Sequence, residues 1–157
     1  MLIRPLDAAD VDAVVDLSLR AWEPVFASME EAVGSAIFRH LFGADWRRYQ
    51  EDDVRRACTA YAVWVAEVDG AVAGFTAIDL PEGSIGEIYM LAVDPDHQRR
   101  GIGSALTAHA VEQIRAAGKT LALVSTGGDP GHAAARATYE RAGFRSLPSE
   151  QYYRIVS

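Results

Sequence analysis

The sequence predicts an α/β protein in which helices pack on a mixed β-sheet. Three observations support this prediction. Segments with alternating or continuous apolar residues are interleaved with segments whose apolar residues recur at helical spacing. Their order is a strand, two helices, three strands, a helix, a strand, a helix and two strands. The chain has 157 residues without a linker or low-complexity tract, which predicts one domain, residues 1–157, around one core.

The first two elements are a short strand and a helix. Residues 1–6 (MLIRPL) alternate in hydropathy and predict the strand. The valines and leucines of residues 11–19 recur at helical spacing, and Asp7 or Asp10 can cap the start of that helix. Pro24 is expected to end the helix, because proline cannot donate the backbone hydrogen bond that a helix interior needs.

The middle of the chain predicts a second helical region and then three strands. Helical spacing extends over residues 29–60, with a break near residues 42–46. Residues 60–80 form two β-rich runs joined at Asp69-Gly70, a dipeptide typical of a hairpin turn. Residues 86–93 (GEIYMLAV) predict a central strand.

The last third of the chain alternates helices and strands. Residues 101–117 return to helical spacing, and residues 120–126 (TLALVST) predict a buried strand. Residues 127–144 begin with turn residues and continue as an alanine-rich helix, in which Asp129-Pro130 resembles an N-cap followed by a first helical residue. Two short strands are expected after it, in the segments FRSL and QYYRIV.

Composition narrows the class of partner. The formal net charge is −7, whereas general nucleic-acid binders carry a basic excess. The single cysteine, Cys58, excludes an internal disulfide and a cysteine-built zinc site. No apolar run approaches the roughly 20 residues that cross a bilayer, and acidic residues come too early for a secretory signal. We therefore expect a soluble cytoplasmic protein with a small cationic or neutral partner and with no nucleic acid, membrane or metal.

The segment DPDHQRRGIG, residues 94–103, has the features of an anion-binding turn. It lies between a predicted strand and a predicted helix, whose first turn leaves its N–H groups unpaired and carries a partial positive charge. Gly101 and Gly103 have no Cβ, so an anion can approach the backbone closely. Arg99 and Arg100 add side-chain charge. A diphosphate ester fits this arrangement.

The glycine spacing discriminates among diphosphates. A nucleotide P-loop needs G-x-x-x-x-G-K-[ST], which the sequence lacks. A dinucleotide fingerprint needs G-x-G-x-x-G, but Leu106 takes the place of the third glycine, and no acidic residue follows at the ribose position about 20 residues on. The remaining candidate is the pyrophosphate of coenzyme A. The alternative is a glycine-rich loop that only turns the chain.

Two segments resemble the motifs of the GNAT N-acetyltransferases. Residues 98–103 (QRRGIG) are similar to the family's Q/R-x-x-G-x-G/A motif, and as in the family they follow a strand ending in V-x-P and open a helix. Residues 135–144 are similar to the second motif, A-x-x-x-Y-x-x-x-G-F. The resemblance covers the whole chain and is strongest over residues 87–144.

This resemblance implies the GNAT fold, a central, mixed and mostly antiparallel sheet of about seven strands flanked by about four helices. It also implies an acetyl-CoA-dependent N-acetyltransferase. Such an acyltransferase moves an acetyl group from the thioester directly to a primary amine of a small molecule or peptide. The alternative is a non-catalytic acyl-CoA-binding sensor module. A third reading, a dinucleotide-binding oxidoreductase, lacks its glycine and its acidic residue.

The resemblance also assigns cofactor-binding residues. In the family, the strand before the first motif diverges from its neighbour and pairs with the pantetheine arm, a role that falls here to Leu91, Ala92 and Val93. His132 takes the place of the second motif's asparagine, which contacts the pantetheine region; it is expected to contact the cofactor or only to begin the helix. The pyrophosphate is expected on the backbone of Arg99, Arg100, Gly101, Ile102, Gly103 and Ser104.

Transfer to an amine needs a proton acceptor for the amine and a proton donor for the departing thiolate. Tyr139 matches the family's proton donor, the alternative being a tyrosine packed on the inner face of a helix. Glu87, fourteen positions before Gly101, matches the glutamate that acts as base in one branch of the family. Partial burial would raise its pKa and make it a better base. The alternative is a solvated glutamate at a strand edge.

The acceptor is expected between the first two helices and the last hairpin of this fold, and its identity stays open. Aromatic side chains beside carboxylates suit a cation. A homodimer is the oligomeric state that analogy with relatives suggests. The candidate acceptor residues are Trp22, Glu23, Phe26, Met29, Glu30, Glu31, Tyr152 and Tyr153.

Overall fold

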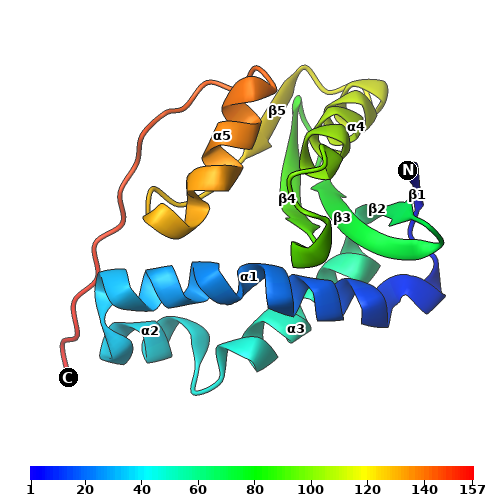
Figure 1. Ribbon diagram of the computed structural model, residues 1–157. Coiled ribbons are helices and arrows are strands. Elements are labelled where there is room, and N and C mark those ends of the chain that lie inside the picture. The colour runs from blue at the N-terminus through cyan, green and yellow to red at the C-terminus, as the bar shows by residue number, and fades with distance from the viewer.

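A five-stranded sheet in the order β1-β2-β3-β4-β5 is the centre of the computed structural model, which describes all 157 residues (Figure 1). Strands β1 to β4 are antiparallel to their neighbours, and β5 is parallel to β4. The mixed sheet that the sequence predicts is therefore confirmed. The strands are β1 (Leu2–Pro5), β2 (Ala62–Val68), β3 (Ala71–Asp79), β4 (Ile85–Val93) and β5 (Leu121–Val124).

Five helices flank the sheet. Helices α1 and α3 pack on one face, and α4 packs on the other. Figure 1 shows α1 crossing beneath both the sheet and α5. None of the helices is both long and apolar enough to cross a membrane. The helices are α1 (Val11–Val33), α2 (Ser35–Phe42), α3 (Trp46–Ala60), α4 (Ile102–Ala116) and α5 (Ala133–Arg141).

The two faces of the sheet form separate apolar clusters. On one face, Val14 of α1 and Val54 of α3 pack in a cluster with Phe75 of β3, and all three side chains are fully buried. On the other face, Leu106 and Ile114 of α4 pack against the strands. Burial of these apolar surfaces is the main force that holds the helices on the sheet.

Strand β4 changes its side-chain alternation at Tyr89. Ile78 of β3 lies opposite Ile88, but Ala77 lies opposite Met90, so Tyr89 is an extra residue in β4. An extra residue bends a strand and redirects its side chains. Ile88 accordingly belongs to the cluster under α4, whereas Tyr89 and Met90 both pack with the cluster under α1 and α3.

The start of α1 agrees with the sequence prediction. Asp7 caps a short 3-10 turn, Ala8–Asp10, that leads into the helix. Its carboxylate accepts a hydrogen bond from the Ala9 N–H, and the Asp10 carboxylate accepts one from the Asp7 N–H. This reciprocal capping satisfies two backbone donors that the helix start would otherwise leave unpaired.

The predicted end of the first helix at Pro24 is wrong, because α1 continues through Pro24 to Val33. A proline inside a helix costs about 3 kcal/mol. Buried residues on both sides of it, Leu17 and Phe26, hold α1 against the rest of the protein and offset this cost. The second helical region is two helices, α2 and α3, separated at residues 43–45, so there are five helices rather than the expected four.

The two expected C-terminal strands are absent, and this part of the prediction is wrong. Residues 142–157 contain no helix or strand and run from the end of α5 to α2 (Figure 1). Tyr153 and Ile155 lie there beside Ile37 and Leu41 of α2. The alternating apolar residues of this segment thus find a helix rather than a neighbouring strand, and the sheet has five strands.

Strand β5 is therefore an edge strand, and the prediction that it is buried is wrong. Leu121 is 57% exposed and Leu123 is 43% exposed. The strand itself forms where it was expected. A short apolar run predicts a strand but does not distinguish a central strand from an edge strand, because that depends on which other segments pair with it.

We expect Leu106→Ala to lower the free energy of unfolding by about 2–5 kcal/mol, because Leu106 is fully buried and its loss leaves a cavity. Leu147→Ala is the matched control. Leu147 is 91% exposed, so its truncation should change the free energy by less than about 0.5 kcal/mol. Urea unfolding measures both, and equal effects would contradict the placement of the core.

Candidate active site

Strands β4 and β5 diverge where the functional site begins. They pair in parallel only between Ile85–Ile88 and Leu121–Val124. Strand β4 continues to Val93, so its edge beyond Ile88 has no neighbouring strand on the β5 side. An unpaired strand edge offers backbone N–H and C=O groups to another extended chain.

A cavity of about 210 Å³ lies at this divergence. Its walls come from α1, α3, β4, the residues that end and follow β5, and α5 with the turn before it. Most of the lining is apolar. The lining residues are Trp22, Val25, Phe26, Met29, Gln50, Ile88, Tyr89, Met90, Leu91, Val124, Ser125, Thr126, His132, Ala135 and Tyr139.

Two polar side chains face this cavity without a protein partner. Gln50 of α3 is only 5% exposed, and its amide makes no hydrogen bond within the protein. The hydroxyl of Tyr139 on α5 also makes none, and burial raises the pKa of Tyr139 to about 12, so the phenol stays protonated at neutral pH. Both groups are therefore free to hydrogen-bond a molecule in the cavity.

Tyr89 lines the cavity with its ring, but its hydroxyl is engaged elsewhere. The hydroxyl donates to Asp53 (2.9 Å) and accepts a hydrogen bond from Arg56, both on α3. Burial, together with the Asp53 carboxylate, raises the pKa of Tyr89 to about 12. These contacts fix the extra residue of β4 to α3.

The turn after β4 has the form that anion binding requires. Gly101 caps α4 in the left-handed conformation, with a φ of 80°, and Arg99 also has a positive φ of 65°. The backbone N–H groups of residues 99–104 make no hydrogen bond within the protein. Neither Arg99 nor Arg100 has an acidic partner. Six free N–H groups and two free guanidinium groups therefore gather at the start of α4.

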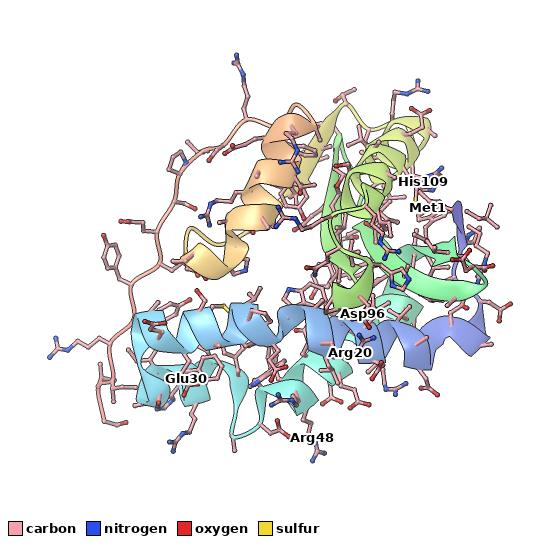
Figure 2. All side chains as sticks on the ribbon, viewed as in Figure 1. Met1, Arg20, Glu30, Arg48, Asp96 and His109 are labelled. Atoms are coloured by element: carbon pink, nitrogen blue, oxygen red, sulfur yellow. The ribbon has the colours of Figure 1, made fainter.

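Arg20 of α1 fixes the start of this turn. Its guanidinium donates two hydrogen bonds, of 2.9 and 2.7 Å, to the two carboxylate oxygens of Asp94. Asp94 also accepts a bond from the Asp96 N–H, and Figure 2 shows Arg20 beside Asp96. The hydrogen bonds from Arg20 hold the pKa of Asp94 below its usual value. A charged, bidentate contact thus ties the turn to α1.

Glu87 lies outside the cavity lining. It is half-buried in β4, directly opposite Asp79 of β3. Burial raises the pKa of Glu87, and the nearby Asp79 carboxylate raises it further. Its carboxylate is therefore a stronger base than an exposed glutamate, but it does not border the cavity that holds Tyr139.

The cavity brings together only part of the predicted site. Leu91, His132 and Tyr139 line it, as do Trp22, Phe26 and Met29 from the expected acceptor set. Ala92, Val93 and residues 99–104 lie further along β4 and the turn that follows it. Of the other acceptor candidates, Glu23 pairs with Arg47, Glu30 accepts a hydrogen bond from Ser35, Glu31 is exposed, and Tyr152 and Tyr153 lie on the C-terminal segment.

Sequence reasoning missed nine lining residues: Val25, Gln50, Ile88, Tyr89, Met90, Val124, Ser125, Thr126 and Ala135. Gln50 did carry a signal. It takes the first position of the buried stripe of α3, ahead of Val54 and Ala57, where an apolar residue is the rule. No cluster of three or more histidine, cysteine or acidic side chains gathers as a metal site would need.

Comparison with known proteins agrees with this geometry. A family model for the acetyltransferase (GNAT) family matches residues 28–144. Mycothiol acetyltransferase from Streptomyces avermitilis is 38% identical over 131 residues, which cover 80% of this chain and 42% of that protein. The chain spans about half, or less, of the length of the mycothiol acetyltransferases that it matches.

Solved structures share the fold. The ribosomal-protein-S18-alanine N-acetyltransferase of Escherichia coli gives a TM-score of 0.68 at 23% identity, covering 94% of this chain and 79% of that one. The PaiA N-acetyltransferase of Thermoplasma acidophilum, in complex with coenzyme A, gives 0.70 at 14% identity, covering 95% and 92%.

We expect Asp94→Asn to lower the free energy of unfolding by about 1–2 kcal/mol at pH 7. A hydrogen bond between charged groups contributes less when water reaches it, and Arg20 is partly exposed. The folded-state pKa of Asp94 is lowered, so its stabilisation is complete above about pH 4 and is lost as the pH falls through that pKa. Urea unfolding at several pH values should show the difference from wild type shrinking only below pH 4.

The control for this pair is Asp96→Asn, since the Asp96 side chain is 85% exposed. It should change the free energy of unfolding by less than about 0.5 kcal/mol. A difference between wild type and Asp94→Asn that stays constant down to pH 2 would show that the charge of Asp94 is not what stabilises the turn.

Proposed function

The chain belongs to the GNAT acetyltransferase family, and from that premise we propose that it transfers an acetyl group from acetyl-CoA to a primary amine of a small molecule or peptide. One observation carries the proposal. The unpaired edge of β4 joins the free N–H groups of residues 99–104 to the cavity that contains the unpaired Tyr139 hydroxyl. A long ligand with a diphosphate at one end and a reactive thioester at the other fits this layout.

The residues present fit coenzyme A. The N–H groups of residues 99–104 and the side chains of Arg99 and Arg100 would hold the pyrophosphate. The free backbone of β4 at Leu91, Ala92 and Val93 would pair with the pantetheine arm, although Gln98 already donates to the Val93 carbonyl. When bound, acetyl-CoA would supply an acetyl group activated as a thioester. No metal is part of the proposal.

Tyr139 would donate a proton to the departing sulfur. Its hydroxyl is free of protein partners, and its pKa, raised to about 12, keeps the proton in place until the sulfur becomes basic. Glu87 would act through water, because its carboxylate does not line the cavity. Its raised pKa suits a group that receives a proton and releases it to solvent.

The acceptor amine would enter the apolar cavity from the side of α1 and α3. Trp22 and Phe26 offer aromatic surface, and Gln50 offers the amide that could recognise a polar group of the acceptor. The sequence relatives are mycothiol acetyltransferases, whereas the solved structures of this fold include aminoglycoside and ribosomal-protein-alanine N-acetyltransferases. The chain covers under half of the Streptomyces avermitilis protein. We therefore propose the class of acceptor, an amine, and leave its identity to a screen.

A thiol-release screen with acetyl-CoA tests the function. The panel holds spermidine, kanamycin, L-lysine and a short peptide with a free amino terminus, each against a reaction without amine. We expect at least one class to release coenzyme A faster than the amine-free reaction. Binding of coenzyme A without thiol release from any amine would favour a sensor module and contradict the proposal.

We expect Arg100→Glu to weaken coenzyme A binding by about tenfold or more, because a charge-assisted hydrogen bond to phosphate becomes a repulsion. Titration calorimetry measures the dissociation constant. Arg48→Glu makes the same charge change on the outer side of α3 (Figure 2) and should leave binding within about twofold of wild type. Equal affinities for wild type and Arg100→Glu would place the pyrophosphate elsewhere.

We expect Tyr139→Phe to lower kcat by about 10²-fold or more, because the sulfur loses its proton donor. The KM for acetyl-CoA should change little, since the ring is retained. Steady-state kinetics between pH 6 and 9 measures both constants. Tyr49→Phe, at a half-exposed tyrosine of α3 that does not line the cavity, is the control and should behave as wild type. Full activity of Tyr139→Phe over this pH range would exclude the proton-donor role.

A further inference from the structure

The turn before α5 holds a carboxylate and an imidazole in contact at the wall of the cavity. Asp129 Oδ1 is hydrogen-bonded to Nδ1 of His132. The other carboxylate oxygen, Oδ2, accepts a 2.6 Å hydrogen bond from the Ser28 hydroxyl of α1. The side chains of His132 and Asp129 are only 17% and 15% exposed. His132 lines the cavity, and its one side-chain hydrogen bond within the protein is the contact of Nδ1 with Asp129, so Nε2 is left free.

The surrounding backbone is shaped to this pair. A Cβ on Gly127 would overlap both the Asp129 carboxylate and the His132 ring, and a Cβ on Gly131 would lie 2.6 Å from the Ser28 Cβ. A side chain at either position would displace these groups, so the close contact of the pair depends on both glycines. Arg136 holds the turn closed with 2.7 Å hydrogen bonds to the carbonyls of Gly127 and Asp129.

The Asp129 contact sets which ring nitrogen of His132 is basic. Burial alone would raise the pKa of Asp129, but the hydrogen bonds from Ser28 and His132 outweigh it, and the pKa lies below its usual value. A carboxylate at Nδ1 keeps the proton on that nitrogen. The lone pair of a neutral His132 is then on Nε2, the nitrogen without a protein partner.

His132 caps the start of α5, and Tyr139 lies within that helix. They are seven residues apart with Ala135 between them, and all three line the cavity. Seven residues correspond to about 10 Å along a helix axis. The N-cap of α5 and its inner face therefore present a proton acceptor and a proton donor to the same cavity. Transfer from a thioester to an amine requires these two groups.

We propose that Asp129 and His132 form the proton-accepting pair of the acetyl transfer, with His132 taking the proton of the acceptor amine and Asp129 and Ser28 positioning it. This inference rests on the proposed function and deepens it. Glu87 does not line the cavity, whereas His132 does. His132 therefore takes the proton of the neutral amine as it attacks, and Glu87 takes through water only the earlier, extra proton of the ammonium form.

The step balances without a further reactant. The amine nitrogen forms a bond to the acetyl carbon, and the bond from that carbon to sulfur breaks with its electron pair on sulfur. One proton leaves the nitrogen for Nε2 of His132, and one leaves the Tyr139 hydroxyl for the sulfur. The imidazolium of His132 then returns a proton through water to the Tyr139 phenolate. The products are the acetylated amine and the free thiol.

Few ionisable groups surround His132. Asp129 and Arg136 come from its own turn and helix, and Tyr139 and Tyr89 are the other ionisable groups that line the cavity. Helix α1 contributes Ser28 and uncharged lining residues, α3 contributes Gln50, and the segment after β5 contributes Ser125 and Thr126.

The decisive variant is His132→Asn, which restores the asparagine of the family motif. An asparagine can still hydrogen-bond the pantetheine region but cannot accept a proton. With the best amine of the screen, we expect kcat to fall about 10²-fold at neutral pH while the KM for acetyl-CoA stays within about twofold. Only the neutral ring of His132 can accept a proton. The kcat of wild type divided by the kcat of the variant should therefore shrink as the pH falls. His40→Asn, on the exposed side of α2, is the control.

The variant Asp129→Asn separates two roles of Asp129, the capping of the turn and the positioning of the His132 ring. Asparagine caps the turn as well as aspartate does, but its amide cannot hold the Nδ1 proton of His132 as a carboxylate does. We expect kcat to fall about tenfold or more with unchanged unfolding midpoints. Nitrogen NMR of the histidine rings, recorded on the protein alone, should show the Nδ1–H form of His132 in wild type and its loss in this variant.

The outcomes separate the two proposals. If wild type transfers acetyl groups, either of two results would overturn the proton-accepting pair of Asp129 and His132 and leave the proposed function standing. One is an unchanged pH profile of kcat in His132→Asn, and the other is a wild-type His132 ring that carries its proton on Nε2. Absence of transfer by wild type with every amine would overturn the proposed function, and with it the role of this pair. A loss of acetyl-CoA affinity in His132→Asn at unchanged kcat would assign His132 to cofactor contact instead.

Discussion

The constraint on which the site depends is that β4 must be a full member of the sheet on one side and remain unpaired on the other. Its hydrogen bonds to β3 extend from Glu87 to Val93, but its pairing with β5 stops at Ile88. The extra residue Tyr89 bends β4 at this point. Because strands can pair only when they run side by side, this divergence creates both the free edge and the cavity below it.

Helix α1 braces both turns that flank the cavity. Arg20 binds Asp94 at the start of the turn after β4, and Ser28 binds Asp129 at the start of the turn before α5. The two contacts are eight residues apart, which is about 12 Å along a continuous helix. The continuity of α1 through Pro24 therefore has a consequence for function, because a helix that ended at Pro24 would leave the two turns without a common support.

The polar groups that hold the turns in place differ from those that face the cavity. Charged contacts are used behind the cavity wall, where Arg20, Arg136 and Ser28 hold backbone and carboxylate groups in place. The groups that face the cavity are neutral or paired. Few charges compete for the proton that an acceptor amine must lose, and the apolar lining strengthens each remaining hydrogen bond.

The sequence by itself determined the five strands, helices α4 and α5 and the two motifs, since local spacing of apolar residues, glycines and caps depends only on neighbours along the chain. It also gave the places of the turn at residues 99–104 and of Tyr139. Only the tertiary structure decided that α1 passes Pro24, that β5 is an edge strand and that the last residues pack near α2, because each outcome depends on which distant segment supplies a partner. For the same reason it alone brought Gln50 to the cavity, left Glu87 outside it, and placed Ser28 and Asp129 behind His132.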